Sequence, residues 1–123
     1  MKKAISSQFN VFLCHNDKDK PTVKIIEGFL RDKGINSFLD KWHLLPGRSS
    51  FEKIESAFNC SKSCAVFVGP HGIGRYQRAE IDIALDRQIN EDDFPVIPVL
   101  LPGSSKSSLS RFLRRNTWVD FRD

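Results

Sequence analysis

The residues best placed to do chemistry in this chain of 123 residues are an aromatic ring and a carboxylate that follow a glycine-rich loop. The loop runs from Gly69 to Gly74 and comes after an apolar run that is typical of a strand. If residues 76–89 are helical, Tyr76 and Glu80 stand at i and i+4 and share one face near the helix start. This pairing is suited to binding a nucleotide and acting on its sugar.

The elements that must position this pair alternate between strand and helix along the chain. Apolar runs predict five strands, at residues 9–14, 35–39, 64–68, 96–101 and 117–119. Helical spacing or helix-start signals fill the intervals, at residues 19–34, from 49 onward, at 76–89 and at 109–115. Right-handed crossovers between parallel strands put helices on both faces of the sheet. We therefore predict a three-layer α/β/α fold with five parallel strands in the order 2-1-3-4-5.

Two local signals refine this prediction. Pro98 lies in the fourth predicted strand and cannot donate to a ladder, so it is expected near a sheet edge or a bend. Ser49 and Glu52 form a capping box that opens the second helix, with Phe51, Ile54 and Phe58 along its inward stripe.

The predicted strand order places a ligand crevice beyond the carboxyl ends of the first and third strands. His15 and Asn16 directly follow the first strand, where their side chains can reach a ribose or a phosphate. The alternative is a turn whose Asn, Asp and Lys residues serve only loop geometry. Gly47 and Phe51, near the end of the second strand's loop, are further substrate-binding candidates, although Phe51 also fits the core.

The helix-start residues also have structural alternatives. Glu80 could be a first-turn acid favoured by the helix dipole, and Tyr76 a half-buried aromatic that steadies the helix entry. Gln77 stands where a full dinucleotide fingerprint needs its last glycine. Gly72 and Gly74 are therefore assigned to a tight turn or a flexible lid, and a redox Rossmann enzyme is disfavoured.

Composition narrows the classes of protein. No apolar run approaches the roughly 20 residues of a membrane helix, and no signal-peptide core is present, so the cytosol is expected. Three cysteines without an export signal indicate reduced thiols, and Cys60 and Cys64 lack the histidine pair of a metal site, so no metal is expected. The net charge of +4 comes without aromatic interleaving or a nucleic-acid module, so nucleic acid is not expected as a partner.

Three segments of the chain resemble the sequence motifs of a known family, in the same order. Residues 9–20, 34–40 with 45–47, and 118–121 look like the first box, the second box with its BB loop, and the third box of Toll/interleukin receptor (TIR) domains. The resemblance covers nearly the whole chain and is closest to the bacterial branch. It implies a single TIR domain at 1–123 with a five-stranded flavodoxin-like sheet.

The resemblance also implies an activity. Bacterial TIR domains similar to this chain are often NAD hydrolases, with a catalytic glutamate at the start of the third helix and a tryptophan-like aromatic four residues earlier. Glu80 and Tyr76 occupy these positions, with Tyr offering a smaller stacking surface than Trp. NAD+ is then a substrate, no cofactor is required, and other TIR domains are partners in an active homo-oligomer.

One carboxylate could suffice for this chemistry. Cleavage of nicotinamide from ribose passes through an oxocarbenium-like sugar, whose positive charge a nearby carboxylate stabilises. Nicotinamide already bears a positive charge as the leaving group, so a general acid is less necessary. The expected products are nicotinamide and ADP-ribose, or a cyclic ADP-ribose species.

A second predicted surface is the loop of Trp42, His43, Leu44, Leu45 and Pro46, which gathers large apolar groups. In TIR domains the corresponding loop contacts a neighbouring domain, so these residues are assigned to assembly; the alternative is a loop folded onto the sheet edge.

Two other functions stay open: a TIR interaction module without chemistry, and a nucleoside deoxyribosyltransferase. The resemblance further predicts an N-terminal portion of a larger protein with a fused or associated sensor domain, acting in anti-phage defence.

Overall fold

The computed structural model describes residues 9–39, 56–91, 93–104 and 116–122. Within these ranges the strands are β1 (Val11–Cys14), β2 (Ser37–Leu39), β3 (Cys64–Val68), β4 (Val96–Leu100) and β5 (Val119–Asp120). The helices are η1 (Asp17–Asp19), α1 (Lys20–Asp32) and α3 (Arg75–Asn90), and residues 56–59 are also helical.

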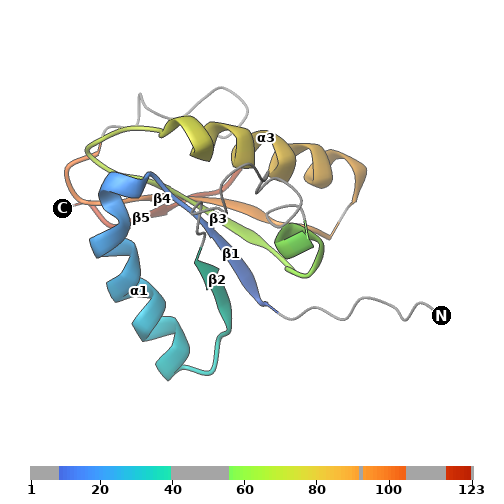
Figure 1. Ribbon diagram of the computed structural model, residues 1–123, viewed down its shortest axis with the longest axis horizontal. Coiled ribbons are helices and arrows are strands. Elements are labelled where there is room, and N and C mark those ends of the chain that lie inside the picture. Colours follow the sequence, from blue (N-terminus) through green and yellow to red (C-terminus); the bar gives the residue numbers. More distant parts are fainter. Residues whose placement is uncertain (1–8, 40–55, 92, 105–115, 123) are drawn as a thin grey trace, which may run out of the picture.

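The strands form one sheet in the order β2-β1-β3-β4-β5, and every pairing is parallel. Figure 1 shows the sheet edge-on, with α3 along one face and α1 along the other. The predicted order 2-1-3-4-5 and the three-layer arrangement are confirmed. Because β1 and β3 are neighbours in the middle of the sheet, their carboxyl ends meet where the order of strands reverses.

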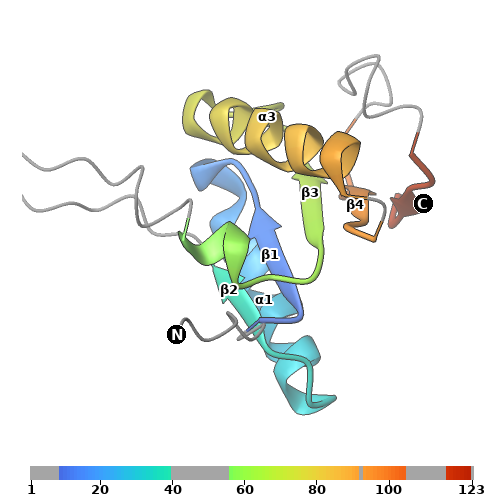
Figure 2. The ribbon, with the colours of Figure 1, turned by 90° about the vertical axis from the view of Figure 1, so that its right-hand side faces the viewer.

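Alternating strand residues supply the two halves of the core. Phe12 and Cys14 of β1 face the side covered by α3 and residues 56–59, where Phe58 stacks on Phe12 with ring centroids 3.9 Å apart. Leu13 faces the opposite side, where Val23 of α1 is fully buried. The turned view in Figure 2 shows the same two layers around the strands.

The boundaries of α1 follow the predicted signals. Pro21 lies in its first turn, where a missing N–H costs nothing, and Gly34 follows its end with φ +80°. Four strand predictions differ at their ends: β1 begins at Val11 rather than at residue 9, and β2 at Ser37 rather than at Ile35. β4 ends at Leu100 rather than at residue 101, and the last strand covers Val119–Asp120 rather than 117–119. These differences lie at element ends, where pairing partners rather than apolar pattern decide the boundary.

Pro98 sits inside β4, opposite Val66 of β3. The carbonyl of Leu100 accepts a bond from the Phe121 N–H on the β5 side, at 2.8 Å. Residues two apart in a strand direct their peptide groups the same way, so the position of the missing Pro98 N–H also faces the β5 side. The described β5 starts one residue later, with Val119 opposite Val99, so the proline removes no ladder bond there.

Several predictions fall outside the described residues: the capping box of Ser49 and Glu52, the inward positions Phe51 and Ile54, and the short helix at 109–115. Phe58, the last residue of the predicted inward stripe, is described and fully buried. In the parts of the chain that the structure covers, no helix is both long and apolar enough to cross a membrane.

Candidate functional site

The loops after β1 and β3 lie against each other, at residues 15–19 and 69–74. We call this region the carboxyl edge. Its main connection is Asn16, whose Nδ2 donates to the carbonyls of His71 and Gly72 at 3.3 and 3.2 Å. A Cβ on Gly74 would lie 3.2 Å from the Asn16 Cγ, so the two loops pack closely. The structure thus brings together the two loops that the strand order predicted to meet.

The geometry gives Asn16 a role within the protein. Its Oδ1 also accepts from the Lys18 N–H at 3.0 Å, which caps η1, so both ends of the amide bond to backbone. These contacts match the turn alternative stated for this residue. Direct contact of Asn16 with substrate stays a prediction.

His15 is 5% exposed and its ring bonds back onto the strand that carries it. Because the Leu13 carbonyl can only accept, Nδ1–H of His15 is the donor in the 2.9 Å bond between them. The imidazole is therefore held at the end of β1. Its assignment to substrate binding stays a prediction.

The glycine loop forms a tight turn, as one of its two assignments predicted. The Gly72 N–H donates to the Gly69 carbonyl at 3.0 Å, and Gly72 has φ +75°, a conformation that favours glycine. The turn delivers the chain to Gly74, the N-cap residue of α3.

Gln77 anchors the start of α3 to both central strands. This side chain is 1% exposed, and its Nε2 donates to the Phe67 carbonyl at 2.7 Å and to the Cys14 carbonyl at 3.4 Å. Its Oε1 accepts from the Gly74 N–H at 2.9 Å. One amide therefore links the ends of β1 and β3 to the helix that carries Tyr76 and Glu80.

Glu80 lies in the second turn of α3 and has no exposed surface. The Cys14 thiol is its neighbour: burial raises the pKa of Cys14 well above the ordinary value, with further contributions from a hydrogen bond to Cys64 and from the charge of Glu80. The carboxylate therefore faces the sheet beneath the carboxyl edge. The alternative, a first-turn acid favoured by the helix dipole, does not fit a residue in the second turn of α3.

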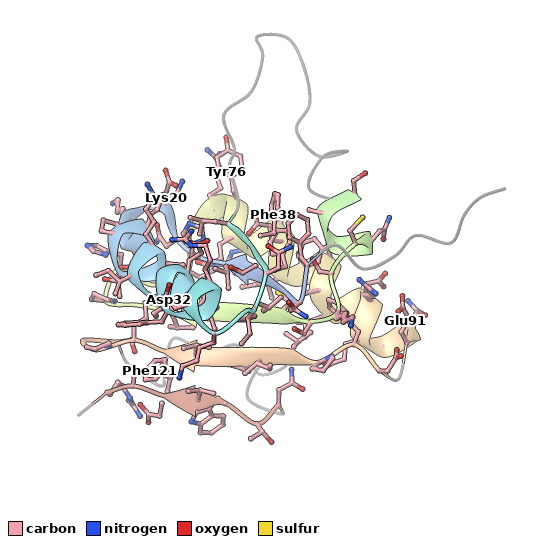
Figure 3. The ribbon with its side chains drawn as sticks, turned by 90° about the horizontal axis from the view of Figure 1, so that it is seen from below. Lys20, Asp32, Phe38, Tyr76, Glu91 and Phe121 are labelled. Carbon is pink, nitrogen blue, oxygen red and sulfur yellow. The ribbon has the colours of Figure 1, made fainter. Side chains whose placement is uncertain are left out.

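Tyr76 differs from Glu80 in its surroundings. It stands at the start of α3, projects away from the sheet (Figure 3) and is 57% exposed. The spacing at i and i+4 was correctly assigned to one helix, but the two side chains lie on different sides of the boundary between solvent and core. A ligand that touches both must therefore reach inward from the surface.

The remaining predicted site residues lie outside the described ranges: Gly47, Phe51 and the assembly loop Trp42, His43, Leu44, Leu45 and Pro46. Their roles stay predictions. Among the described residues, no group of three or more His, Cys, Asp or Glu side chains is arranged to hold a metal ion.

Sequence reasoning missed two parts of the carboxyl edge. Gln77 was considered only as a break in a glycine fingerprint, although its position one turn before the buried Ile81 marks it as inward-facing. The contact between His71 and Asp19, with Nδ1 and Oδ1 2.7 Å apart, had no sequence signal, because the two residues are 52 positions apart.

An open cavity of about 730 Å³ lies elsewhere, at the carboxyl ends of β4 and β5. It is lined by Pro102, Gly103, Ser104, Asp120 and Arg122. None of the predicted site residues lines it, and its two charged groups already pair with each other, with Nη2 of Arg122 2.8 Å from Oδ2 of Asp120. We therefore keep the carboxyl edge of β1 and β3 as the candidate site.

The sheet order and the buried helix-start carboxylate define a flavodoxin-like α/β domain with its candidate site at the carboxyl edge. A profile of the TIR domain matches residues 11–123, so the chain belongs to the TIR-domain family. No curated protein matches the chain.

Solved structures have the same fold. The TIR domain of the Toll-related receptor TRR-2 from Hydra magnipapillata is 19% identical, with a TM-score of 0.71 over 93% of this chain and 85% of that one. A metazoan TIR-STING receptor from C. gigas, in complex with 2′,3′-cGAMP, is 22% identical, with a TM-score of 0.76 over all of this chain and 38% of that one. The TIR domains of the activated Roq1 resistosome are 24% identical, with a TM-score of 0.62 over 76% of this chain and 57% of that one.

Proposed function

We propose that this TIR domain cleaves the bond between nicotinamide and ribose in NAD+, with Glu80 as the catalytic carboxylate. The observation that carries the proposal is the complete burial of Glu80 on the inner side of α3, beneath the carboxyl edge. A carboxylate kept from water at the switch point of a flavodoxin-like sheet is in a low-dielectric place, where its charge acts strongly on a cationic sugar. Family membership supports the same activity.

In the proposed reaction, the bond between C1′ of the ribose and the nicotinamide nitrogen breaks, and both electrons go to the departing ring. Nicotinamide becomes neutral, and the sugar passes through an oxocarbenium-like state that the Glu80 carboxylate stabilises. Attack by water, with loss of one proton, gives ADP-ribose. Attack by a ring nitrogen of the same molecule's adenine gives a cyclic ADP-ribose species instead.

Assembly is proposed as the step that activates the enzyme. In the single chain Glu80 has no exposed surface, so a substrate must gain access before the carboxylate can touch it. Contact with a second TIR domain is a means of rearranging this surface, and the predicted assembly residues Trp42 to Pro46 are proposed to take part. The isolated domain is then expected to show little activity.

Tyr76 is proposed to stack on the nicotinamide. Its ring is 57% exposed at the start of the helix that carries Glu80, so it is accessible to a planar ligand.

We also propose a cytoplasmic location, a fused or associated sensor domain, and a role in bacterial immunity against phage. An immune role is supported by the likeness to Roq1, whose structure is of a resistosome recognising the pathogen effector XopQ.

The test is nicotinamide release from NAD+ by the full-length protein, clustered on a scaffold. Glu80→Gln keeps the size of the side chain and removes its charge, so we expect release to fall about a hundredfold or more. The matched control is Asp82→Asn, which removes an exposed carboxylate two residues along the same helix. A thermal melt confirms that both variants are folded. Equal release by Glu80→Gln and the wild type would remove Glu80 from the mechanism.

A non-catalytic interaction module is the second candidate. It is favoured by a pair of exposed apolar residues on α1, Ile25 and Phe29, which are 62% and 64% exposed and one helical turn apart. Self-association that depends on this surface, with no loss of NAD+ in any assembled state, would support the module in place of the enzyme.

A further inference from the structure

The carboxyl edge contains a histidine and an aspartate that the proposed reaction does not use. The Asp19 side chain is 4% exposed, and its Oδ1 lies 2.7 Å from Nδ1 of His71, whose own side chain is 49% exposed. A carboxylate can only accept when ionised, so Nδ1–H of His71 is the donor. The pair joins a buried charge in the loop after β1 to an accessible ring in the loop after β3.

Gly69 packs closely against the carboxylate of Asp19. A Cβ at this position would lie 2.6 Å from Cγ of Asp19, so any other residue here requires the carboxylate to move. None of the described residues bonds Oδ2. An ionised carboxylate buried with so few partners is costly, and the His71 ring is the group that compensates for it.

The ring itself has one orientation that satisfies these contacts. Its backbone is held by the bond from Asn16 Nδ2 to the His71 carbonyl, and its Nδ1 is held by Asp19. Nε2 is then the nitrogen that a ligand can reach, and none of the described residues bonds it. When the ring is protonated, Nε2–H becomes a donor, and the charge of Asp19 balances the charge of the ring.

The surroundings of His71 favour an anion. Lys18, in the first of these loops, and Arg75, the first residue of α3, are exposed, and neither has an acidic partner among the described residues. Asp17 is exposed, and its Oδ1 lies 3.4 Å from Nζ of Lys20. The carboxylate of Asp19 is paired with His71. The amino-terminal end of α3, a helix of 16 residues, adds a partial positive charge at Gly74.

We propose that His71, oriented by Asp19, donates a hydrogen bond from Nε2 to a phosphate of the nucleotide bound at the carboxyl edge. The inference rests on the proposed function only in taking a nucleotide as the ligand. Here His71 is a binding residue and Asp19 a positioning residue, and neither takes part in breaking the glycosidic bond.

Two substitutions separate ligand contact from loop support. In His71→Asn, the side-chain Nδ2 overlies the imidazole Nδ1, so the bond to Asp19 remains and the Nε2 donor is lost. In His71→Gln, the side-chain Nε2 overlies the imidazole Nε2, so a donor remains where the phosphate is expected. Lys33→Ala is the charge control, because this exposed lysine follows the far end of α1.

The experiment measures the dissociation constants of ADP-ribose and of adenosine, which lacks phosphate, for the full-length protein. We expect His71→Asn to weaken ADP-ribose binding about tenfold and to leave adenosine binding unchanged, because the lost bond is to a charged group. His71→Gln is expected to stay within about threefold of the wild type, and Asp19→Asn to fall between the two variants. Lys33→Ala is expected to bind both ligands normally.

Three results would overturn the inference: normal ADP-ribose binding by His71→Asn, equal weakening of both ligands, or no ADP-ribose binding by the wild type. ADP-ribose is not cleaved, so the measurement is independent of Glu80. Loss of ADP-ribose affinity in His71→Asn, together with no release of nicotinamide by the assembled wild type, would overturn the enzyme and retain the phosphate site.

Discussion

Two regions along the carboxyl side of the sheet are built differently. At β1 and β3, buried polar side chains connect the loops, with Asn16, Asp19 and Gln77 each at most 9% exposed. At β4 and β5, the cavity is lined by an exposed ion pair between Asp120, in the two-residue strand β5, and Arg122, which lies just after that strand. Burying polar groups is costly unless each finds a partner, so their concentration at β1 and β3 indicates where the fold holds loops in fixed positions.

Replacing Gln77 is expected to give the largest effect on stability. Gln77→Ala leaves the carbonyl of Phe67 and the N–H of Gly74 without their side-chain partner, which is expected to lower the free energy of unfolding by about 2–3 kcal/mol. Urea denaturation measures the change. Gln88→Ala is the matched control, because Gln88 lies on the same helix, is half-buried and has no such bonds to the residues that the structure describes. Equal losses in both variants would show that the Gln77 amide adds nothing beyond its apolar stem.

The buried thiol under the carboxyl edge predicts an intermediate effect that depends on pH. Burial raises the pKa of Cys14 in the folded state, so the folded chain keeps a proton that the unfolded chain loses above about pH 8.5. Stability contributed by this group is present below that pH and is lost as pH rises. We expect a loss of about 1 kcal/mol between pH 8 and pH 9.5.

The comparison is with Cys14→Ala. This variant is expected to be less stable at every pH, but its stability should not show the loss between pH 8 and pH 9.5 that the Cys14 thiol causes. Cys60→Ala removes a thiol that is not fully buried and is expected to keep the slope of the wild type. The pH dependence of urea midpoints measures the difference. Parallel curves for the wild type and Cys14→Ala would contradict the prediction.

The smallest effect on stability is expected at the carboxyl ends of β4 and β5. Arg122 pairs with Asp120 two residues earlier on the surface, and exposed ion pairs contribute little because water competes for both charges. Arg122→Ala is therefore expected to leave the urea midpoint unchanged within error. A clear drop would mean that the two regions of the carboxyl side are more alike than their burial indicates.

The sequence was sufficient to predict the fold because its signals are local and agree with one another. Apolar runs, Pro21 in the first turn of α1 and the glycine after α1 place the elements, and the crossover rule then leaves few possible orders of the strands. Element ends were less predictable: the start of β2 at Ser37 depends on pairing with Val11 of β1, which no local pattern records.

The candidate site was predictable only in part. The meeting of the loops after β1 and β3 follows from topology, so their positions could be stated in advance. The partners that form across those loops could not, because Asp19 with His71 and Gln77 with Phe67 are long-range or side-chain contacts without a characteristic spacing. The opposite environments of Tyr76 and Glu80 also required coordinates, since a shared helical face does not say where the surface ends.

The proline in β4 has a consequence for how β5 docks. A short outer strand with few bonds can slide along its neighbour, because each shift of two residues offers an equivalent set of partners. On the side of β4 that faces β5, Pro98 provides no N–H, so a β5 displaced toward the amino end of β4 would lose one of its few bonds. The proline thus favours the register in which Val119 pairs with Val99 over registers shifted toward the amino end of β4.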